Sequence, residues 1–88
     1  MTLDEIRDLI QTNKLDEAEK ELQRMYQNEP SETVFLLSGN LYRKRGDWQH
    51  ALNNFYEALE LNPEGEAKMA IEHIQNILDF SNKDLINP

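Results

Sequence analysis

An internal repeat constrains the fold of this chain more than any other feature of its sequence. At a fixed offset of 33 residues, positions of matching role coincide: Asn13 with Gly46, Leu15 with Trp48, Ala18 with Ala51, Leu22 with Phe55, Met25 with Ala58, and Pro30 with Pro63. Such a period is typical of repeat proteins, whose units bury their apolar faces by stacking on one another. At 88 residues, the chain has the length of one small domain.

Within each unit, apolar residues recur at steps of three and four, which is the period of an amphipathic helix. Leu15, Ala18, Leu22 and Met25 have this spacing, and the segment 48–59 repeats it. We therefore expect no strand and five helices, over residues 3–12, 15–28, 32–45, 48–61 and 66–80.

Local signals mark the ends of these helices. Thr2 and Glu5 have the spacing of a capping box at the start of the first helix. Gly46 suits a left-handed C-terminal cap, and Asp47 suits the N-cap of the next helix. Asn13, at the matching place in the first unit, is the residue that best replaces glycine at a positive φ.

The second unit resembles a known repeat. It has a large residue, a glycine and a tyrosine on its first helix, small and aromatic residues on its second, and a closing proline: Phe35, Gly39, Tyr42, Ala51, Phe55, Ala58 and Pro63. Together with Gly46 and Trp48 at the turn, this pattern resembles the tetratricopeptide repeat over residues 32–64. The first unit matches at Ala18, Leu22, Met25 and Pro30. It departs at Ile6, and the second unit departs at Ser38, where the family usually has leucine.

The resemblance implies an all-α fold of antiparallel helical hairpins, stacked as a short right-handed α-solenoid of about five helices. It divides the single domain into a degenerate first repeat, a second repeat, a capping helix and a tail, over residues 1–31, 32–65, 66–80 and 81–88. Leu85 and Ile86 favour a tail that folds back against the last helix. A disordered terminus is the alternative.

Charge and composition narrow the classes of function. Nine Lys and Arg residues against seventeen Asp and Glu residues give a net charge of −8. This is the opposite of the basic surface that nucleic-acid binding or anionic membranes require. No apolar run approaches the roughly 18 residues of a membrane span. The sequence contains no cysteine, which excludes disulfides and thiolate metal sites, and we expect a cytoplasmic protein.

The sequence offers little for catalysis. His50 and His73 belong to different predicted helices, whereas a zinc site needs three or four converging ligands. Glu19 and its acidic neighbours fit a solvated helix face, and the isolated glycines form no phosphate-binding loop. We therefore predict no enzyme activity, no cofactor and no metal.

The helix over 32–45 has more apolar residues than one core face needs. Leu36 and Leu37 remain once its core side is assigned, and in the resembled family the position of Leu36 faces a concave groove. The resemblance places ten residues in that groove: Leu3, Arg7, Ile10, Leu36, Asn40, Arg43, Lys44, Ala70, Ile74 and Ile77. The result would be an apolar groove with a basic rim, and such patches mark interaction sites. The alternative is that the last helix seals the array, and that the cations form a solvated helix terminus.

These features favour a protein–protein interaction module that binds a peptide or helix of another protein. The partner segment would be acidic or amphipathic, because cations border the groove. Some tetratricopeptide repeat proteins hold the C-terminal carboxylate of heat-shock chaperones with a clamp of lysines and asparagines. Only Asn40 matches that clamp here, so we do not expect this activity. The alternative function is homo-oligomerisation, as in a homodimer, through the same apolar surfaces.

Overall fold

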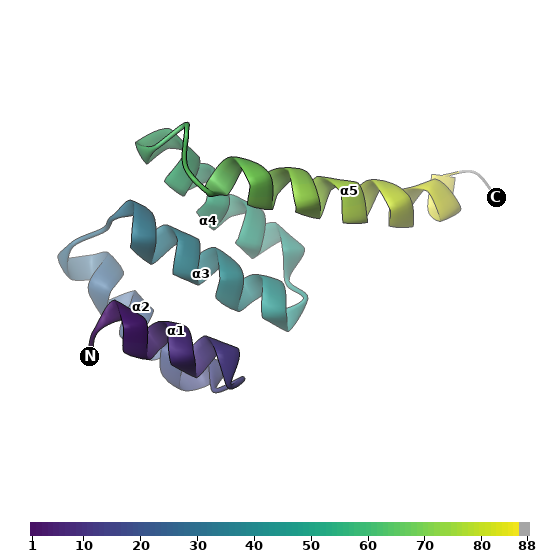
Figure 1. Ribbon diagram of the computed structural model, residues 1–88. Coiled ribbons are helices and arrows are strands. Elements are labelled where there is room, and N and C mark those ends of the chain that lie inside the picture. Colours follow the sequence, from purple (N-terminus) through teal and green to yellow (C-terminus); the bar gives the residue numbers. More distant parts are fainter. Residues whose placement is uncertain (87–88) are drawn as a thin grey trace.

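The computed structural model describes the backbone of residues 1–86 and the side chains of residues 1–79. The described residues form helices without β-strands (Figure 1): α1 (Leu3–Gln11), α2 (Leu15–Asn28), α3 (Glu32–Arg45), α4 (Trp48–Leu61) and α5 (Ala67–Ile86). The predicted all-α fold is confirmed, and α1 to α4 begin and end within a residue of their predicted bounds. None of these helices is both long and apolar enough to cross a membrane.

The predicted end signals are present. The Thr2 hydroxyl accepts a hydrogen bond from the Glu5 backbone N–H (3.2 Å), and the Glu5 carboxylate accepts one from the Thr2 N–H (3.0 Å). Gly46 ends α3 at a φ of 76°, and the Asp47 side chain caps α4. Asn13 turns the chain between α1 and α2 at a φ of 66°, so both turns use the left-handed conformation.

The helices form two hairpins and a closing helix. α1 and α2 make the first hairpin, α3 and α4 the second, and α5 packs against α4 (Figure 1). α3 contacts both helices of the first hairpin as well as its own partner, α4. The third helix is therefore the centre of the molecule.

Two hydrophobic clusters lie on either side of α3. The first joins the two hairpins and consists of Ile6, Ile10, Ala18, Leu22, Val34, Leu37 and Leu41. The second joins α3, α4 and α5 and consists of Phe35, Ala51, Phe55, Ala58, Ala67, Ile71 and Ile74. Because α3 contributes to both clusters, it is apolar on two sides, which explains why its sequence contains more large apolar residues than one face requires.

The repeat-signature residues have structural roles. The alanines at 18, 51 and 58 are fully buried, and Leu22 and Phe55 are buried beside them. The Gly39 backbone on α3 lies against the Phe55 ring of α4, with no room for a side chain between them. Met25, Tyr42 and Trp48 are half-buried against the clusters. Pro30 and Pro63 are exposed and follow the ends of α2 and α4.

Three predicted groove or surplus residues are buried and pack in the core. Leu37 is 3% exposed and packs in the first cluster with Ile10, which is 4% exposed. Ile74 is fully buried in the second cluster. The reason is that α1 and α5 lie close enough to α3 and α4 to cover these positions.

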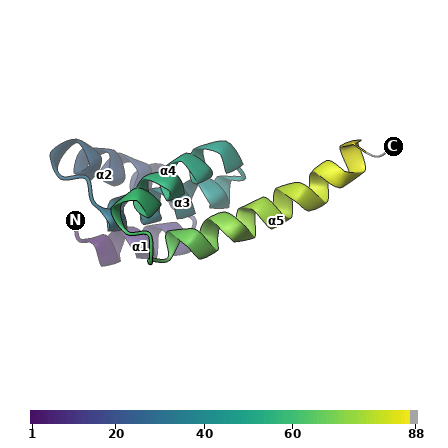
Figure 2. The same cartoon turned by 90° about the horizontal axis from the view of Figure 1, so that it is seen from above.

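The predicted end of the last helix was also wrong. α5 continues to Ile86, and its C-terminal half projects beyond the hairpins (Figure 2). Residues 81–86 therefore do not fold back, because no proline or glycine interrupts the segment 66–86. The remainder of the predicted tail, residues 87–88, lies outside the described residues.

Candidate functional site

Three adjoining hollows run along the exposed side of α3, between α1 and α5, and we call them together the α3 groove. Asn40 of α3 lines all three hollows, and each of Arg7 of α1 and Leu36 and Arg43 of α3 lines two of them. The two hollows that include Arg7 have volumes of about 380 and 310 Å³, and the one bordered by α5 has about 400 Å³. A continuous surface of this size and shape is suited to a peptide or helix rather than to a deeply enclosed small molecule.

Arg43 is held in place at the end of the groove that lies near the C-terminus of α3. Its Nη2 donates a hydrogen bond to Asn40 Oδ1 at 2.7 Å, and its guanidinium carbon lies 5.9 Å from the centre of the Phe55 ring. The neighbouring Lys44 donates from Nζ to the Gln11 carbonyl at 3.3 Å. Arg43 is thus a fixed cation in contact with an apolar floor, which is a suitable arrangement for an incoming carboxylate.

The opposite end of the groove is acidic. Glu32 at the start of α3 and Glu66 just before α5 line the hollow that also contains Asn62 and Gly65. A β-carbon on Gly65 would lie only 2.3 Å from Glu32 Oε2, so the missing side chain leaves room for this carboxylate. Arg7, which pairs with Asp4, lines the same hollow. The groove therefore has two carboxylates and one paired cation near the start of α3, Arg43 and Lys44 near its end, and Leu36 between them.

Most of the predicted groove residues are brought together. Seven of the ten line the three hollows: Arg7, Ile10, Leu36, Asn40, Arg43, Lys44 and Ala70. Ile10 contributes there from a buried position. Leu3 and Ile77 are half-buried and line none of these hollows, and Ile74 is core.

Sequence reasoning missed the acidic end and the α5 wall of the groove. Glu66, Met69 and His73 line the hollow beside α5. Met69 is 76% exposed, the largest exposed fraction of any bulky apolar side chain described. The sequence signal that could have identified Met69 is its position next to Ala70, which is one of the predicted groove residues.

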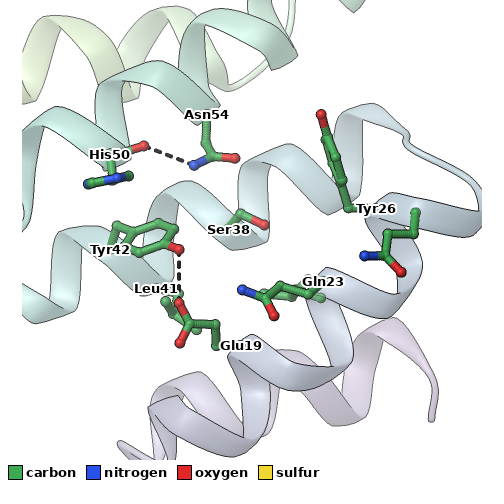
Figure 3. Close-up of a pocket in the computed structure, with 10 residues that line it drawn as sticks. Glu19, Gln23, Tyr26, Ser38, Leu41, Tyr42, His50 and Asn54 are labelled. Atoms are coloured by element: carbon green, nitrogen blue, oxygen red, sulfur yellow. Dashed lines mark hydrogen bonds between the residues drawn. The ribbon is translucent and has the colours of Figure 1, made fainter.

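A separate hollow, which the sequence did not predict, lies between α2 and α4 (Figure 3). We call it the α2–α4 cleft, and its volume is about 450 Å³. Its lining residues come from α2, α3 and α4: Glu19, Leu22, Gln23, Tyr26, Gln27, Ser38, Leu41, Tyr42, His50 and Asn54. Ser38 of α3 lies between the other labelled residues in Figure 3, and its side chain is the smallest of those that line the cleft.

An ionic network closes one end of this cleft. Glu19 accepts a hydrogen bond from the Tyr42 hydroxyl at 2.9 Å and one from Arg45 Nη1 at 3.0 Å. Arg45 also pairs with Asp16. Glu19 is therefore a structural link between α2 and α3, a role that the expected solvated helix face did not include.

The same contacts shift two acid–base equilibria. Hydrogen bonds from Arg45 and then Tyr42 stabilise the charged carboxylate, which holds the pKa of Glu19 below its usual value. Burial and the hydrogen bond to Glu19 raise the pKa of Tyr42. At neutral pH, Glu19 is ionised and Tyr42 keeps its donor proton.

The fold and its two surfaces define a small all-α protein of stacked helical hairpins with hollows on both sides of α3. The chain matches the solution NMR structure of Bacteroides fragilis protein BF1650, a structural genomics target, with a TM-score of 0.87 and 42% sequence identity. The match covers 98% of this chain and 89% of that one. The chain therefore belongs to the same family as this Bacteroides protein. No family model matches it, and a comparison with curated proteins finds no relative.

Proposed function

We propose that the protein is a non-catalytic interaction module that binds a peptide or helix of another protein in the α3 groove. The observation that carries this proposal is the position of Arg43, fixed by Asn40 and Phe55 beside the half-buried Leu36. A cation held in place before binding loses little freedom when it pairs with a carboxylate. An adjacent apolar residue supplies a contact for the hydrophobic side of the same segment.

The charges of the groove specify the partner further. An acidic residue of the partner would lie against Arg43 and Lys44, and a basic one against Glu32 and Glu66. An apolar residue between them would contact Leu36. The preferred partner is thus an amphipathic segment with opposite charges at its two ends, despite the net charge of −8 on the whole chain.

We also infer that the chain is a short member of the tetratricopeptide repeat family. Support comes from the buried alanines at 18, 51 and 58 and from the Gly39–Phe55 contact, which give the signature positions of the sequence a packing role. A protein without cysteine fits a cytoplasmic location, which we include in the proposal.

The groove is tested with the double variant Leu36→Ala and Arg43→Ala. A displayed library of amphipathic helices is selected on the wild type, and each clone is then measured on the variant. We expect at least about tenfold weaker binding, because both the apolar contact and the fixed cation are lost.

A matched control removes the same residue types elsewhere. Leu61 is 58% exposed and the Arg24 side chain is 70% exposed, and neither lines the groove. The variant Leu61→Ala with Arg24→Ala should bind the selected clones like the wild type. Clones that bind all three proteins equally would show that the groove is not the binding site.

Self-association is the second candidate, favoured by the projection of α5 beyond the hairpins (Figure 2) and by exposed Met69. A second copy could cover these surfaces and compensate for the small number of repeats. Sedimentation over a wide concentration range tests this candidate, which predicts a rising mass. A constant monomer mass would eliminate it.

A further inference from the structure

We propose that the α2–α4 cleft is a second binding site, which takes an extended, uncharged peptide segment with one apolar side chain inserted above Ser38. The cleft lies across α3 from the groove and shares none of its lining residues. The proposal therefore does not depend on the function assigned to the groove. Its volume of about 450 Å³ is within the usual range of ligand pockets, about 300 to 1,000 Å³.

The cleft combines an apolar floor with aromatic ends. Buried Leu22 and Leu41 lie at its base. At one end the Tyr42 and His50 rings stack, with centres 5.2 Å apart and planes 30° from parallel. At the other end Tyr26 stands edge-on to Phe35, with ring centres 5.6 Å apart, and Figure 3 shows its ring rising beside the opening. These surfaces favour an aliphatic or aromatic side chain.

Neutral hydrogen-bonding groups surround the opening. Asn54 uses its Nδ2 to donate to the His50 carbonyl at 2.9 Å, which leaves its Oδ1 as an acceptor. Within residues 1–79, no hydrogen bond engages the Ser38 hydroxyl or the amides of Gln23 and Gln27. Amide side chains both donate and accept, as the peptide backbone does, so they can pair with successive backbone groups of an extended segment.

The Glu19 and His50 side chains at the cleft already have partners. Both oxygens of Glu19 are engaged, one by Arg45 and the other by Tyr42. The Nδ1 atom of His50 lies 2.7 Å from an Asp47 oxygen. No lysine or arginine lines the cleft. A charged ligand would lose hydration without gaining an opposite charge, and this favours an uncharged one.

Blocked pentapeptides test the proposal. Acetyl-Gly-Ser-Xaa-Ser-Gly-amide, with Xaa as Leu, Phe, Lys, Asp or Gly, is titrated into the ¹⁵N-labelled full chain. The Leu and Phe peptides should produce saturable NMR shifts at Gln23, Ser38 and Asn54. The Lys, Asp and Gly peptides should bind at least about tenfold more weakly, because they lack the apolar anchor or carry an uncompensated charge.

Variants of the protein separate the cleft from the groove. Ser38→Leu fills the space that the apolar side chain of the peptide would occupy. It should weaken binding of the Leu peptide at least about tenfold. Gln23→Ala changes only an exposed side chain and should weaken binding of the Leu peptide less than Ser38→Leu does. This variant tests the cleft if Ser38→Leu fails to fold. Leu36→Ala, in the groove, should leave this binding unchanged.

Several results would overturn the proposal. These are the absence of saturable shifts with the Leu peptide, shifts confined to the α3 groove, or equal binding of charged and apolar peptides. The proposal would also be overturned if Ser38→Leu and Gln23→Ala both fold and both bind the Leu peptide like the wild type. Shifts at the cleft that appear on concentrating the protein without peptide would identify a second copy as the occupant instead.

Discussion

The ring of Phe55 occupies the space where a side chain on Gly39 would stand. A β-carbon built on Gly39 would lie 2.6 Å from Phe55 Cε1, well inside van der Waals contact. Phe55 is only 1% exposed and packs in the second cluster, so a shift of its ring would disturb that packing. The close approach of α3 and α4 therefore depends on glycine at position 39, which has only a hydrogen atom in place of a side chain.

Gly39→Ala should destabilise the fold. We expect a loss of about 1 to 3 kcal/mol from overpacking, partly offset by the roughly 0.5 to 1 kcal/mol by which alanine favours a helix interior. Urea denaturation measures the net effect. Ser38→Ala, one residue earlier on α3, adds no atoms and should change stability by less than about 0.5 kcal/mol. A Gly39→Ala protein as stable as the wild type would contradict the proposed packing.

Gly46→Ala should also destabilise the fold, for a different reason. A β-carbon at Gly46 would meet no atom within 4 Å, so the cost comes only from the φ of 76°. We expect about 1 kcal/mol, measured as a lower Tm. Gly46→Asn should lose less, because asparagine tolerates this conformation and already adopts it at position 13. Equal losses for the two variants would contradict this explanation.

Glu19 should make stability dependent on pH in the acid range. Its pKa is lower in the folded chain than its ordinary value of 4.5, because Arg45 and Tyr42 stabilise the carboxylate. Its contribution is therefore present above the unfolded pKa and is lost as the pH falls through the folded pKa. Glu19→Gln should be less stable than the wild type at pH 7, and the difference should shrink as the pH falls below about 4.

Two further variants check the Glu19 network by chemical denaturation. Tyr42→Phe removes one of the two hydrogen bonds and should lose about 0.5 to 1.5 kcal/mol at pH 7. Glu17→Gln changes an exposed carboxylate in the first turn of the same helix and should change the stability at pH 7 by less than about 0.5 kcal/mol. A difference between Glu19→Gln and wild type that stays constant down to pH 3 would count against the ionic contact.

Ser38→Leu should stabilise the protein. The side chain would cover Leu22 and Leu41 at the floor of the α2–α4 cleft. Burying a leucine fully contributes about 1.5 to 3 kcal/mol, and this half-buried site should gain about 1 kcal/mol. A higher urea midpoint with the same slope is the expected measurement. A lower midpoint would mean that the cleft is too narrow for the side chain.

The sequence predicted the helices well because their ends are marked by local residues. Thr2 with Glu5, Asn13, and Gly46 with Asp47 each act within a few residues of their own position. The end of α5 has no such mark within the helix, and the predicted stop near residue 80 was wrong. The length of a helix without a stop signal depends on its contacts with the rest of the fold, and the sequence alone does not give those contacts.

The surfaces were less predictable because they depend on neighbours distant in sequence. Helical periodicity placed Leu36 and Leu37 outside the expected core face, but only the position of α1 decides that Leu37 is buried. The Tyr42–Glu19 contact joins residues 23 apart, and no spacing rule indicates it. Ser38 departs from the repeat pattern, and this departure lies at the α2–α4 cleft.

The two-sided helix α3 has a consequence for how the molecule unfolds. Val34 and Phe35 are neighbours in sequence but belong to different hydrophobic clusters, so loss of the first hairpin, or of α4 and α5, would expose one side of α3 to water. Neither hairpin can then unfold without destabilising the other. The cooperativity of unfolding therefore depends mainly on α3. The backbone amides of α3 should accordingly be the last to exchange their hydrogens for deuterium.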